Sequence, residues 1–545
     1  MALSQSQPYS SRAARSLRLG AATLLHHLKR HVGVGIICSV AYFDPGNWSV
    51  DLQAGSSFGY RPMLFVILMA GLGAIVLQTL AYKLGCVTGL DLATHCRLLF
   101  HNHPRHPRLV RRLVLYPLYI LSEIAIISTD LAELLGSAIG FCLLFPKLPL
   151  WAGVVLTAAD VLIFLAFSDP SRGQGRPVRL FEYTIIALVF CVFGSFVALL
   201  IKAKPNWSQA FLGYLPDKAL FQSDPDAVYA AVGILGATVM PHALFLGSSL
   251  ATQDRVSDAQ PLSENYLHRA ASSVDYRSKH GERENRPLTF INQHLSHGVV
   301  DVVTSLIALA VPINSAILIL AAAVFFNGAG QNRNTPAGLF DAYDLIKARI
   351  GDAAAVIFAL ALICAGQTSS ITVTLAGQIV SEGFIEWKVS PFLRRIITRC
   401  ISLVPSMVVS IAVGRDGINT LLVASQVILS VVLPFVAFPL IYLTSAEVVM
   451  RVWKPQEIIE AEVAPIPELT QEPHENQVDL DAVKVEAEHM EISTIKVAEQ
   501  DKVDRMVRKE YLDYSNGRFT AALAYVIWCI VLVANAYAIV MLFLR

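Results

Sequence analysis

Eleven apolar stretches of membrane-spanning length recur along this 545-residue chain and constrain its fold more than any other feature. A helix needs about 20 consecutive apolar residues to cross a bilayer, and its backbone polar groups must be satisfied within the protein. The stretches lie at 32–57, 62–84, 113–141, 148–168, 180–202, 227–251, 298–326, 352–383, 395–413, 419–444 and 519–544. Since 54% of the residues are hydrophobic and only 16% are charged, we expect an all-α polytopic membrane protein with about eleven transmembrane helices.

Basic residues are concentrated in alternate loops, those after spans two, four, six and eight. Because positively charged loops remain on the cytosolic side, these loops and the N-terminus are predicted to be cytosolic. Plasma membrane and vacuolar or endosomal membrane fit this topology equally. Lys+Arg 43 against Asp+Glu 42 leaves a formal charge of +1, which gives no indication of nucleic-acid binding.

The first apolar stretch is interrupted by the run Asp44-Pro45-Gly46-Asn47. An aspartate is costly at membrane depth, and a proline removes a backbone donor and clashes with the preceding turn. The helix should break here. Irregular backbone at this depth survives where it is buried in protein or lines a cavity, so the break is expected to present Asp44 and Asn47 to a ligand.

The sixth stretch carries a second interruption, GATVMPHALFLGSS, in which Gly236, Pro241 and His242 break an apolar run. Breaks in spans one and six of ten are typical of an inverted five-plus-five repeat with its binding site at the midplane. The predicted division is a cytosolic tail at 1–31, repeats at 32–202 and 227–445 with a cytosolic loop at 253–297, an acidic cytosolic linker at 446–518, and an eleventh helix at 519–545.

The side chains at the two breaks form a mixed set of metal ligands. Asp44 offers an anionic oxygen, Asn47 a neutral oxygen and Met240 a thioether, and Pro241 should free a backbone carbonyl near Ala237. Oxygen ligands alone suit Mg²⁺ or Ca²⁺, whereas a thioether favours a softer ion such as Mn²⁺, Fe²⁺, Co²⁺ or Cd²⁺. The set therefore predicts a divalent transition-metal site. The alternative is that Met240 only fills space, as methionines in apolar helices commonly do.

Several motifs resemble the natural resistance-associated macrophage protein (Nramp) family of proton-coupled divalent-metal transporters. They are Asp-Pro-Gly-Asn at 44–47, DLQAG at 51–55, VTGLDLA at 87–93, ATVMPH at 237–242, INSAILILAAAVF at 313–325, AGQTSSITVTLAGQIVSEGF at 365–384, LRRIITR at 393–399 and SQVILSVVLPF at 425–435. The resemblance implies a LeuT-like fold and metal ligation by Asp44, Asn47, the Ala237 carbonyl and Met240, with Gln426 joining in some conformations. The sequence at 237–248 is similar to that of fungal members of the family.

Two positions depart from the pattern of many relatives, which carry asparagine and a second histidine after Met-Pro-His. Here these positions are Ala243 and Gly247, although His242 is present. The second histidine has been linked to proton handling in parts of the family. That role does not carry over to this chain.

Three acidic residues in the third span, Glu123, Asp130 and Glu133, are spaced to share one broad helix face. Intramembrane carboxylates usually mark ion or proton routes and have basic partners nearby. The candidate partners lie at the start of span nine: Arg394, Arg395 and Arg399. The resemblance adds His242, Asp130, Glu133 and Arg395 to a proton-route hypothesis. In the alternative interpretation the arginines are positive-inside anchors and Glu123 is an interfacial residue.

The predicted function is proton-coupled import of divalent metals by alternating access, with metal and protons as transported substrates and no resident cofactor. A membrane-embedded metalloenzyme would need a closed His/Cys set or an HExxH helix, and neither occurs, so no enzymatic activity is expected. The alternatives are a sodium-coupled carrier of an organic solute, a Mg²⁺ carrier, or a metal sensor signalling through 450–518. Asn314 and Gln367 are expected to form interhelical hydrogen bonds in preference to lining the pathway.

Overall fold

The computed structural model describes residues 33–167, 178–218, 220, 226–256, 284–326, 338–386, 390–412, 414–454 and 511–544. The predicted tail at 1–31 lies outside the described residues, as do 257–283 of the loop and 455–510 of the linker. Within the described residues, ten helical segments are long and apolar enough to cross a membrane. The first predicted span is additional to these ten, because it is divided into two short helices.

The long helices follow the predicted spans. They are α4 (Met63–Thr88), α7 (Tyr116–Leu144), α8 (Leu150–Phe167), α9 (Arg179–Ala203), α15 (Leu288–Ser305) continuing into α16 (Val311–Ala321), α18 (Asp352–Ile385), α19 (Pro391–Ala412), α20 (Gly414–Ser445) and α23 (Arg518–Leu544). Shorter helices α5 (Leu92–His101), α6 (Pro107–Val110), α10 (Trp207–Leu212), α17 (Leu339–Ile350) and α21 (Glu447–Met450) connect them. Helix α15 begins earlier than the predicted span 298–326, because its polar first turns had lowered the local hydropathy.

Both predicted helix breaks are present. In the first span, α2 (Val34–Val40) ends before α3 (Pro45–Phe58), and Asp44 caps α3 by accepting a hydrogen bond from the Asn47 N–H at 2.9 Å. In the sixth span, α12 (Asp226–Thr238) ends before α13 (Pro241–Leu250), with Met240 as the extended N-cap residue. Each second half-helix begins with a proline, whose fixed φ and missing N–H suit the first helical position.

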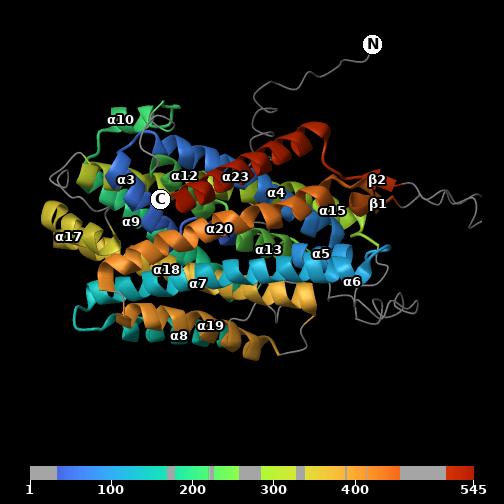
Figure 1. Ribbon diagram of the computed structural model, residues 1–545, viewed down its shortest axis with the longest axis horizontal. Coiled ribbons are helices and arrows are strands. Elements are labelled where there is room, and N and C mark those ends of the chain that lie inside the picture. Colours follow the sequence, from blue (N-terminus) through green and yellow to red (C-terminus); the bar gives the residue numbers. More distant parts are fainter. Residues whose placement is uncertain are drawn as a thin grey trace, which may run out of the picture.

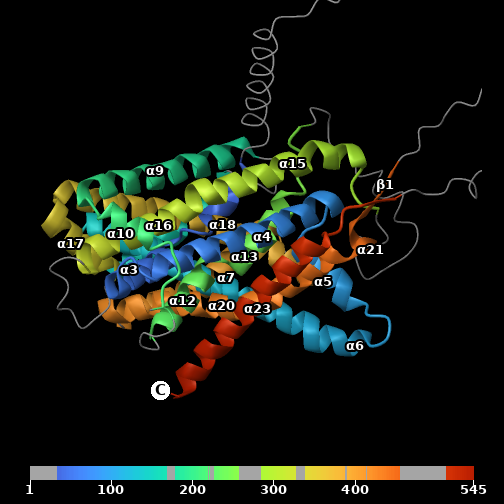
Figure 2. The ribbon, with the colours of Figure 1, turned by 90° about the horizontal axis from the view of Figure 1, so that it is seen from above.

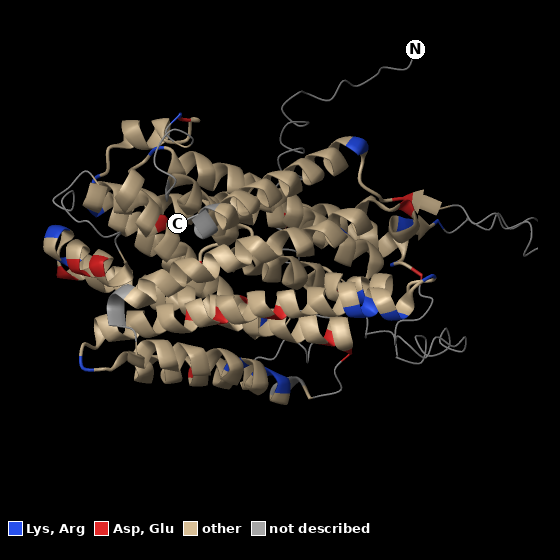
Figure 3. Ribbon diagram, viewed as in Figure 1, with Lys and Arg blue, Asp and Glu red and all other residues tan. Residues whose placement is uncertain are grey.

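Half-helix α13 packs against α4 and α18 and lies among the longer helices in both views (Figures 1 and 2). Helices α7 and α18 pack along each other, and α8 and α19 pair at one edge of the molecule, while α20 and α23 pack together on another side. Helix α3 contacts α16, α12, α20 and α7, so it is enclosed by helices from both repeats. Figure 3 shows few charged residues inside the bundle, and those of α7 stand out against otherwise uncharged ribbon.

The described ends of the acidic linker are ordered, which the sequence composition did not predict. Strand β1 (Arg451–Trp453) pairs antiparallel with β2 (Tyr511–Asp513). The start of α23 is then tied to the bundle, because Asn516 donates from its side-chain nitrogen to Thr444 Oγ1 at 2.8 Å and accepts from Lys83 Nζ at 3.1 Å. The chain therefore leaves and re-enters the membrane bundle at nearly the same place (Figure 1).

The contact between α3 and α7 depends on Gly136, because a Cβ added there would overlap the Pro45 ring. We expect Gly136→Ala to destabilise the detergent-purified protein by about 1–3 kcal/mol, since overpacking forces the two helices apart. The measurement is the thermal unfolding temperature. Gly194→Ala on α9 is the matched control, as a Cβ at Gly194 meets nothing within 4 Å. Equal unfolding temperatures for the two variants would contradict a tight α3–α7 contact.

Candidate metal site and proton pathway

The five predicted metal ligands come from three places in the fold. Asp44 and Asn47 lie at the start of α3, Ala237 and Met240 flank the break between α12 and α13, and Gln426 lies within α20. All five are buried, with exposed fractions between 0% and 2%.

Tight contacts at two glycines bring these elements together. A Cβ at Gly46 would overlap the Gln426 side-chain amide and approach Asp44 Oδ2 to 3.1 Å. A Cβ at Gly236, next to Ala237, would overlap the Gln426 carbonyl oxygen and approach Ser430 Cβ to 2.6 Å. At Gly236 a side chain is excluded because two backbones approach each other closely, and at Gly46 the Gln426 side chain lies against the backbone. Asp44, Gln426 and the end of α12 therefore lie around one point.

Several polar atoms at this point are buried and have no hydrogen-bond partner in the protein. They are Asp44 Oδ2, both side-chain heteroatoms of Asn47, Gln426 Oε1 and both ring nitrogens of His242. Burying such groups without partners costs free energy, so native proteins rarely leave them clustered. A cation bound among them would satisfy the oxygen atoms. The donor set fits a divalent cation.

The Ala237 carbonyl also lacks its helical hydrogen-bond donor and is therefore available to a cation. In a continuous helix it would accept a hydrogen bond from residue 241, but that residue is Pro241, which has no N–H. The ends of α2 and α12 place partial negative charge at the breaks, and the starts of α3 and α13 place partial positive charge there. The breaks therefore expose carbonyl oxygen toward a cation while Asp44 supplies the full negative charge.

Gln78 of α4 connects the two breaks, and sequence reasoning missed it. Its Oε1 accepts from Tyr42 Oη at 3.0 Å at the first break, and its Nε2 donates to the Ala243 carbonyl at 3.3 Å in α13. A lone amide in an otherwise apolar span was the available signal. The departure at Gly247 has a physical reason, because a Cβ there would overlap the Gln78 amide.

The two amides expected to bond between helices do so. Asn314 Nδ2 of α16 donates to the Tyr42 carbonyl at 2.6 Å, and Gln367 Nε2 of α18 donates to Asp160 Oδ2 of α8 at 2.8 Å. The first of these bonds satisfies a carbonyl that the break between α2 and α3 leaves outside regular helix. Asn314 therefore stabilises the irregular backbone beside Asp44.

The acidic residues of α7 meet arginines of α19 inside the protein. Arg399 pairs with Asp130, and its Nη1 also donates to Ser370 Oγ at 2.9 Å. Arg394 pairs with Glu123 at 3.1 Å. Arg395 donates to Gln378 Oε1, a residue that sequence reasoning did not name, at 3.0 Å from Nε and 2.8 Å from Nη2.

All three arginines are buried in the protein, with exposed fractions of 1–2%. Glu133 is wholly buried, accepts a hydrogen bond from Ser369 Oγ, and lies within electrostatic range of both Asp44 and Asp130. These carboxylates form a line of titratable groups from the break in the first span toward α19. The proton-route role remains a prediction.

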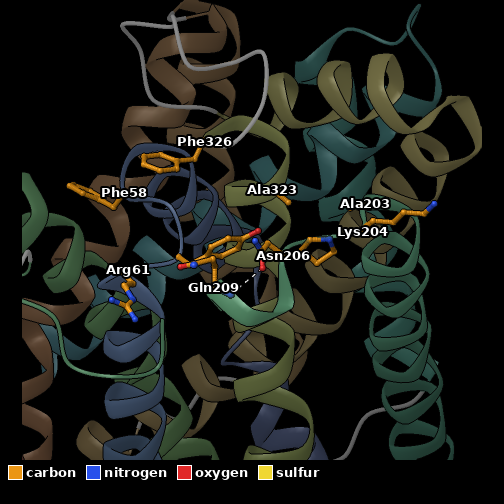
Figure 4. Close-up of a pocket in the computed structure, with 10 residues that line it drawn as sticks. Phe58, Arg61, Ala203, Lys204, Asn206, Gln209, Ala323 and Phe326 are labelled. Carbon is orange, nitrogen blue, oxygen red and sulfur yellow. Dashed lines mark hydrogen bonds between the residues drawn. The ribbon is translucent and has the colours of Figure 1, made fainter. Parts of the chain in front are cut away.

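A separate cavity of about 560 Å³ opens at the other end of α3 (Figure 4). Its lining includes Phe58, Arg61, Lys204, Asn206 and Phe326. Since α3 has 14 residues, this end lies about 20 Å along the axis from Asp44. In the predicted topology the cavity faces the outer side.

Comparison with known proteins identifies related sequences over most of the chain. A family profile described as natural resistance-associated macrophage protein-like matches residues 35–463. The manganese transporter pdt1 of Schizosaccharomyces pombe is 42% identical over 424 residues, covering 78% of this chain and 76% of that protein. The iron transporter SMF3 of Saccharomyces cerevisiae is 40% identical over 441 residues, covering 80% of this chain and 86% of that protein.

Solved structures confirm the predicted fold class, a LeuT-like inverted repeat with broken helices one and six. A mutant of the manganese transporter of Eremococcus coleocola matches with a TM-score of 0.66 at 27% identity, covering 93% of this chain and 85% of that chain. Mhp1, a nucleobase-cation-symport-1 family transporter, matches in a closed conformation with a TM-score of 0.50 at 11% identity, covering 76% and 78%. The second likeness concerns the fold alone.

The buried pair of Arg399 and Asp130 generates a stability prediction. Removing one partner of a buried pair leaves an uncompensated charge, at a cost of about 3–5 kcal/mol. We expect Arg399→Gln to lower the thermal unfolding temperature sharply and the double variant Arg399→Gln/Asp130→Asn to recover part of the loss. Arg61→Gln is the control, because its pair with Asp217 is 41% and 27% exposed and should contribute under about 1 kcal/mol. If Arg399→Gln melted like Arg61→Gln, the buried pair would not stabilise the fold.

Proposed function

Because this chain belongs to the natural resistance-associated macrophage protein (Nramp) family, we propose that it imports Mn²⁺ and Fe²⁺ into the cytosol by proton-coupled secondary transport. Co²⁺ and Cd²⁺ are further substrates in this proposal. The family is one of membrane transporters and not a class of enzymes. The observation that carries the proposal is the group of unpartnered buried oxygens at Asp44, Asn47 and Gln426, between two half-helix breaks.

Metal selection in this proposal depends on the mixture of donors. Asp44 supplies charge, Asn47, Gln426 and the Ala237 carbonyl supply neutral oxygen, and Met240 supplies a thioether. Mn²⁺ and Fe²⁺ accept such a mixture, whereas Ca²⁺ and Mg²⁺ gain nothing from sulfur and prefer oxygen alone. The wholly buried Met240 side chain, at the start of α13, supports this reading.

Proton coupling would use the line of carboxylates in α7. A divalent cation beside Asp44 favours the deprotonated carboxylate, so metal arrival would release a proton there. Glu133 is the next carboxyl within electrostatic range, and Asp130 follows with its arginine partner. Protons would pass along these groups to the cytosolic side, with Glu123, Arg394 and Arg395 further along α7 and α19. His242, which has no partner in the protein, is a second acceptor beside the metal.

Alternating access would expose the site in turn to each side. The start of α2 is held by Asp301, whose Oδ2 accepts from the Gly35 N–H at 2.7 Å. Beside it, Glu182 of α9 forms a buried ion pair with Arg255. Release to the cytosol would require α2 to leave these contacts. Import from outside the cell and import from an acidic vacuolar or endosomal lumen both move the metal in this direction, into the cytosol.

Metal uptake is tested with the purified protein in proteoliposomes under an inward proton gradient. We expect saturable Mn²⁺ uptake that falls by roughly a hundredfold in Asp44→Ala, because loss of a buried charged ligand costs about 3 kcal/mol. Met240→Ala should relax discrimination against Ca²⁺. The matched control is Met69→Ala, since Met69 is 43% exposed on the outer face of α4. Normal Mn²⁺ uptake by Asp44→Ala, or transport of Mg²⁺ in place of Mn²⁺ by the wild type, would contradict the metal assignment.

Proton coupling is tested by recording internal pH during Mn²⁺ uptake. We expect Mn²⁺ to acidify wild-type liposomes, and Glu133→Gln to lose most of this acidification while retaining measurable Mn²⁺ uptake, because its amide cannot carry a proton. Glu386→Gln is the control, since that carboxylate follows the end of α18 and pairs with Arg97 of α5. Mn²⁺ uptake by the wild type that leaves the internal pH unchanged would contradict proton coupling.

A further inference from the structure

Helix α20 contains Pro434 inside a membrane span, and this proline leaves one carbonyl without its helical donor. The carbonyl belongs to Ser430, which would otherwise accept a hydrogen bond from the N–H of residue 434. At membrane depth such a group must find another partner, because no water is available there.

Asn535 of α23 supplies that partner. Its Nδ2 donates to the Ser430 carbonyl at 2.6 Å, and its side chain is buried, with 4% exposed. Helix α23 is otherwise strongly apolar and largely exposed on its outer face. A single asparagine in such a helix is costly unless it bonds to a neighbouring helix. Asn535 lies opposite the Ser430 carbonyl, which Pro434 leaves without a helical donor, and its side chain satisfies that carbonyl.

The Ser430 carbonyl belongs to the helical turn that begins at Gln426. The same turn packs against Gly236 of α12, where an added Cβ would overlap the Gln426 carbonyl oxygen and approach the Ser430 nitrogen to 2.8 Å. Gly236 directly precedes Ala237. One turn of α20 therefore carries one predicted metal ligand and supports the backbone of another, and Asn535 bonds to the far end of that turn.

We propose that Asn535 is a positioning residue for the metal site: its hydrogen bond fixes the turn of α20 that precedes Pro434 and so holds Gln426 against Asp44 and α12 against the site. The eleventh helix thereby contributes to metal binding although it lies outside both five-helix repeats. This inference rests on the proposed metal-transport function.

A second bond between the same helices provides a matched control. Trp528 Nε1 of α23 donates to the Pro434 carbonyl at 2.9 Å, and its ring lies 5.5 Å from that of Phe438. The Pro434 carbonyl can also accept from the N–H of Phe438 within α20, so losing the indole donor does not orphan it. Trp528→Phe removes one interhelical hydrogen bond and keeps the aromatic packing.

The test measures Mn²⁺ uptake kinetics and calorimetric Mn²⁺ affinity for the full-length protein. We expect Asn535→Leu to raise the KM and the dissociation constant for Mn²⁺ about three- to tenfold, and Trp528→Phe to change each by less than about twofold. Unchanged constants for Asn535→Leu would overturn the inference. A loss of folded protein or of kcat with unchanged Mn²⁺ affinity would also overturn it, because the role would then be structural only.

Pro434→Ala provides the rescue, since alanine restores an N–H that can serve the Ser430 carbonyl. In this background Asn535→Leu should cause no further loss of Mn²⁺ affinity, which calorimetry records even where Pro434→Ala slows transport. An equal loss in both backgrounds would mean that Asn535 does not act through Ser430, and the inference would fall. If the wild type neither binds nor transports Mn²⁺, the proposed function fails first, and that result is distinct from an unaffected Asn535→Leu.

Discussion

The structure depends on one constraint, which is that every backbone carbonyl and amide buried in the membrane bundle needs a partner. Pro241 and Pro434 violate this locally, and the chain resolves the two violations differently. Beside Pro241 the Ala237 carbonyl is left toward the candidate site, whereas beside Pro434 the Ser430 carbonyl is bonded by Asn535. At the first proline the freed carbonyl is a potential cation ligand, and at the second it is a point where another helix attaches.

Buried charged side chains in the bundle need partners in the same way. Arg399 is bonded to Asp130, and it also donates to two hydroxyl groups of α18, Ser370 Oγ at 2.9 Å from Nη1 and Thr374 Oγ1 at 2.8 Å from Nη2. Glu133 accepts a hydrogen bond from Ser369 Oγ and feels Arg399 only through space, whereas Asp130 is in direct contact with that arginine. In a medium of low dielectric, a carboxyl without a cation changes protonation more readily than one in a pair.

Local patterns in the sequence predicted the spans and both helix breaks. The length of an apolar run and the positions of proline and aspartate within it can be read from a short stretch of sequence, without knowledge of distant contacts. They also indicated that Asn314 and Gln367 bond between helices. They did not predict Gln78, Gln378 or Asn535 as partners of Ala243, Arg395 and Ser430, since each pairing depends on the rotation of one helix against another far along the chain. The pairing of β1 with β2 was missed for the same reason, as the acidic composition between them describes only the connecting segment.

That strand pairing also determines how the chain can vary. Because Trp453 lies opposite Tyr511, the segment 454–510 begins and ends at one point on the bundle. The free energy of loop closure rises only slowly with loop length, by about 0.6 kcal/mol for each doubling. The length of this segment therefore has little effect on the packing of the membrane bundle. Natural insertions and deletions, or a fluorescent protein inserted by design, can accumulate there without altering the packing of α20 against α23.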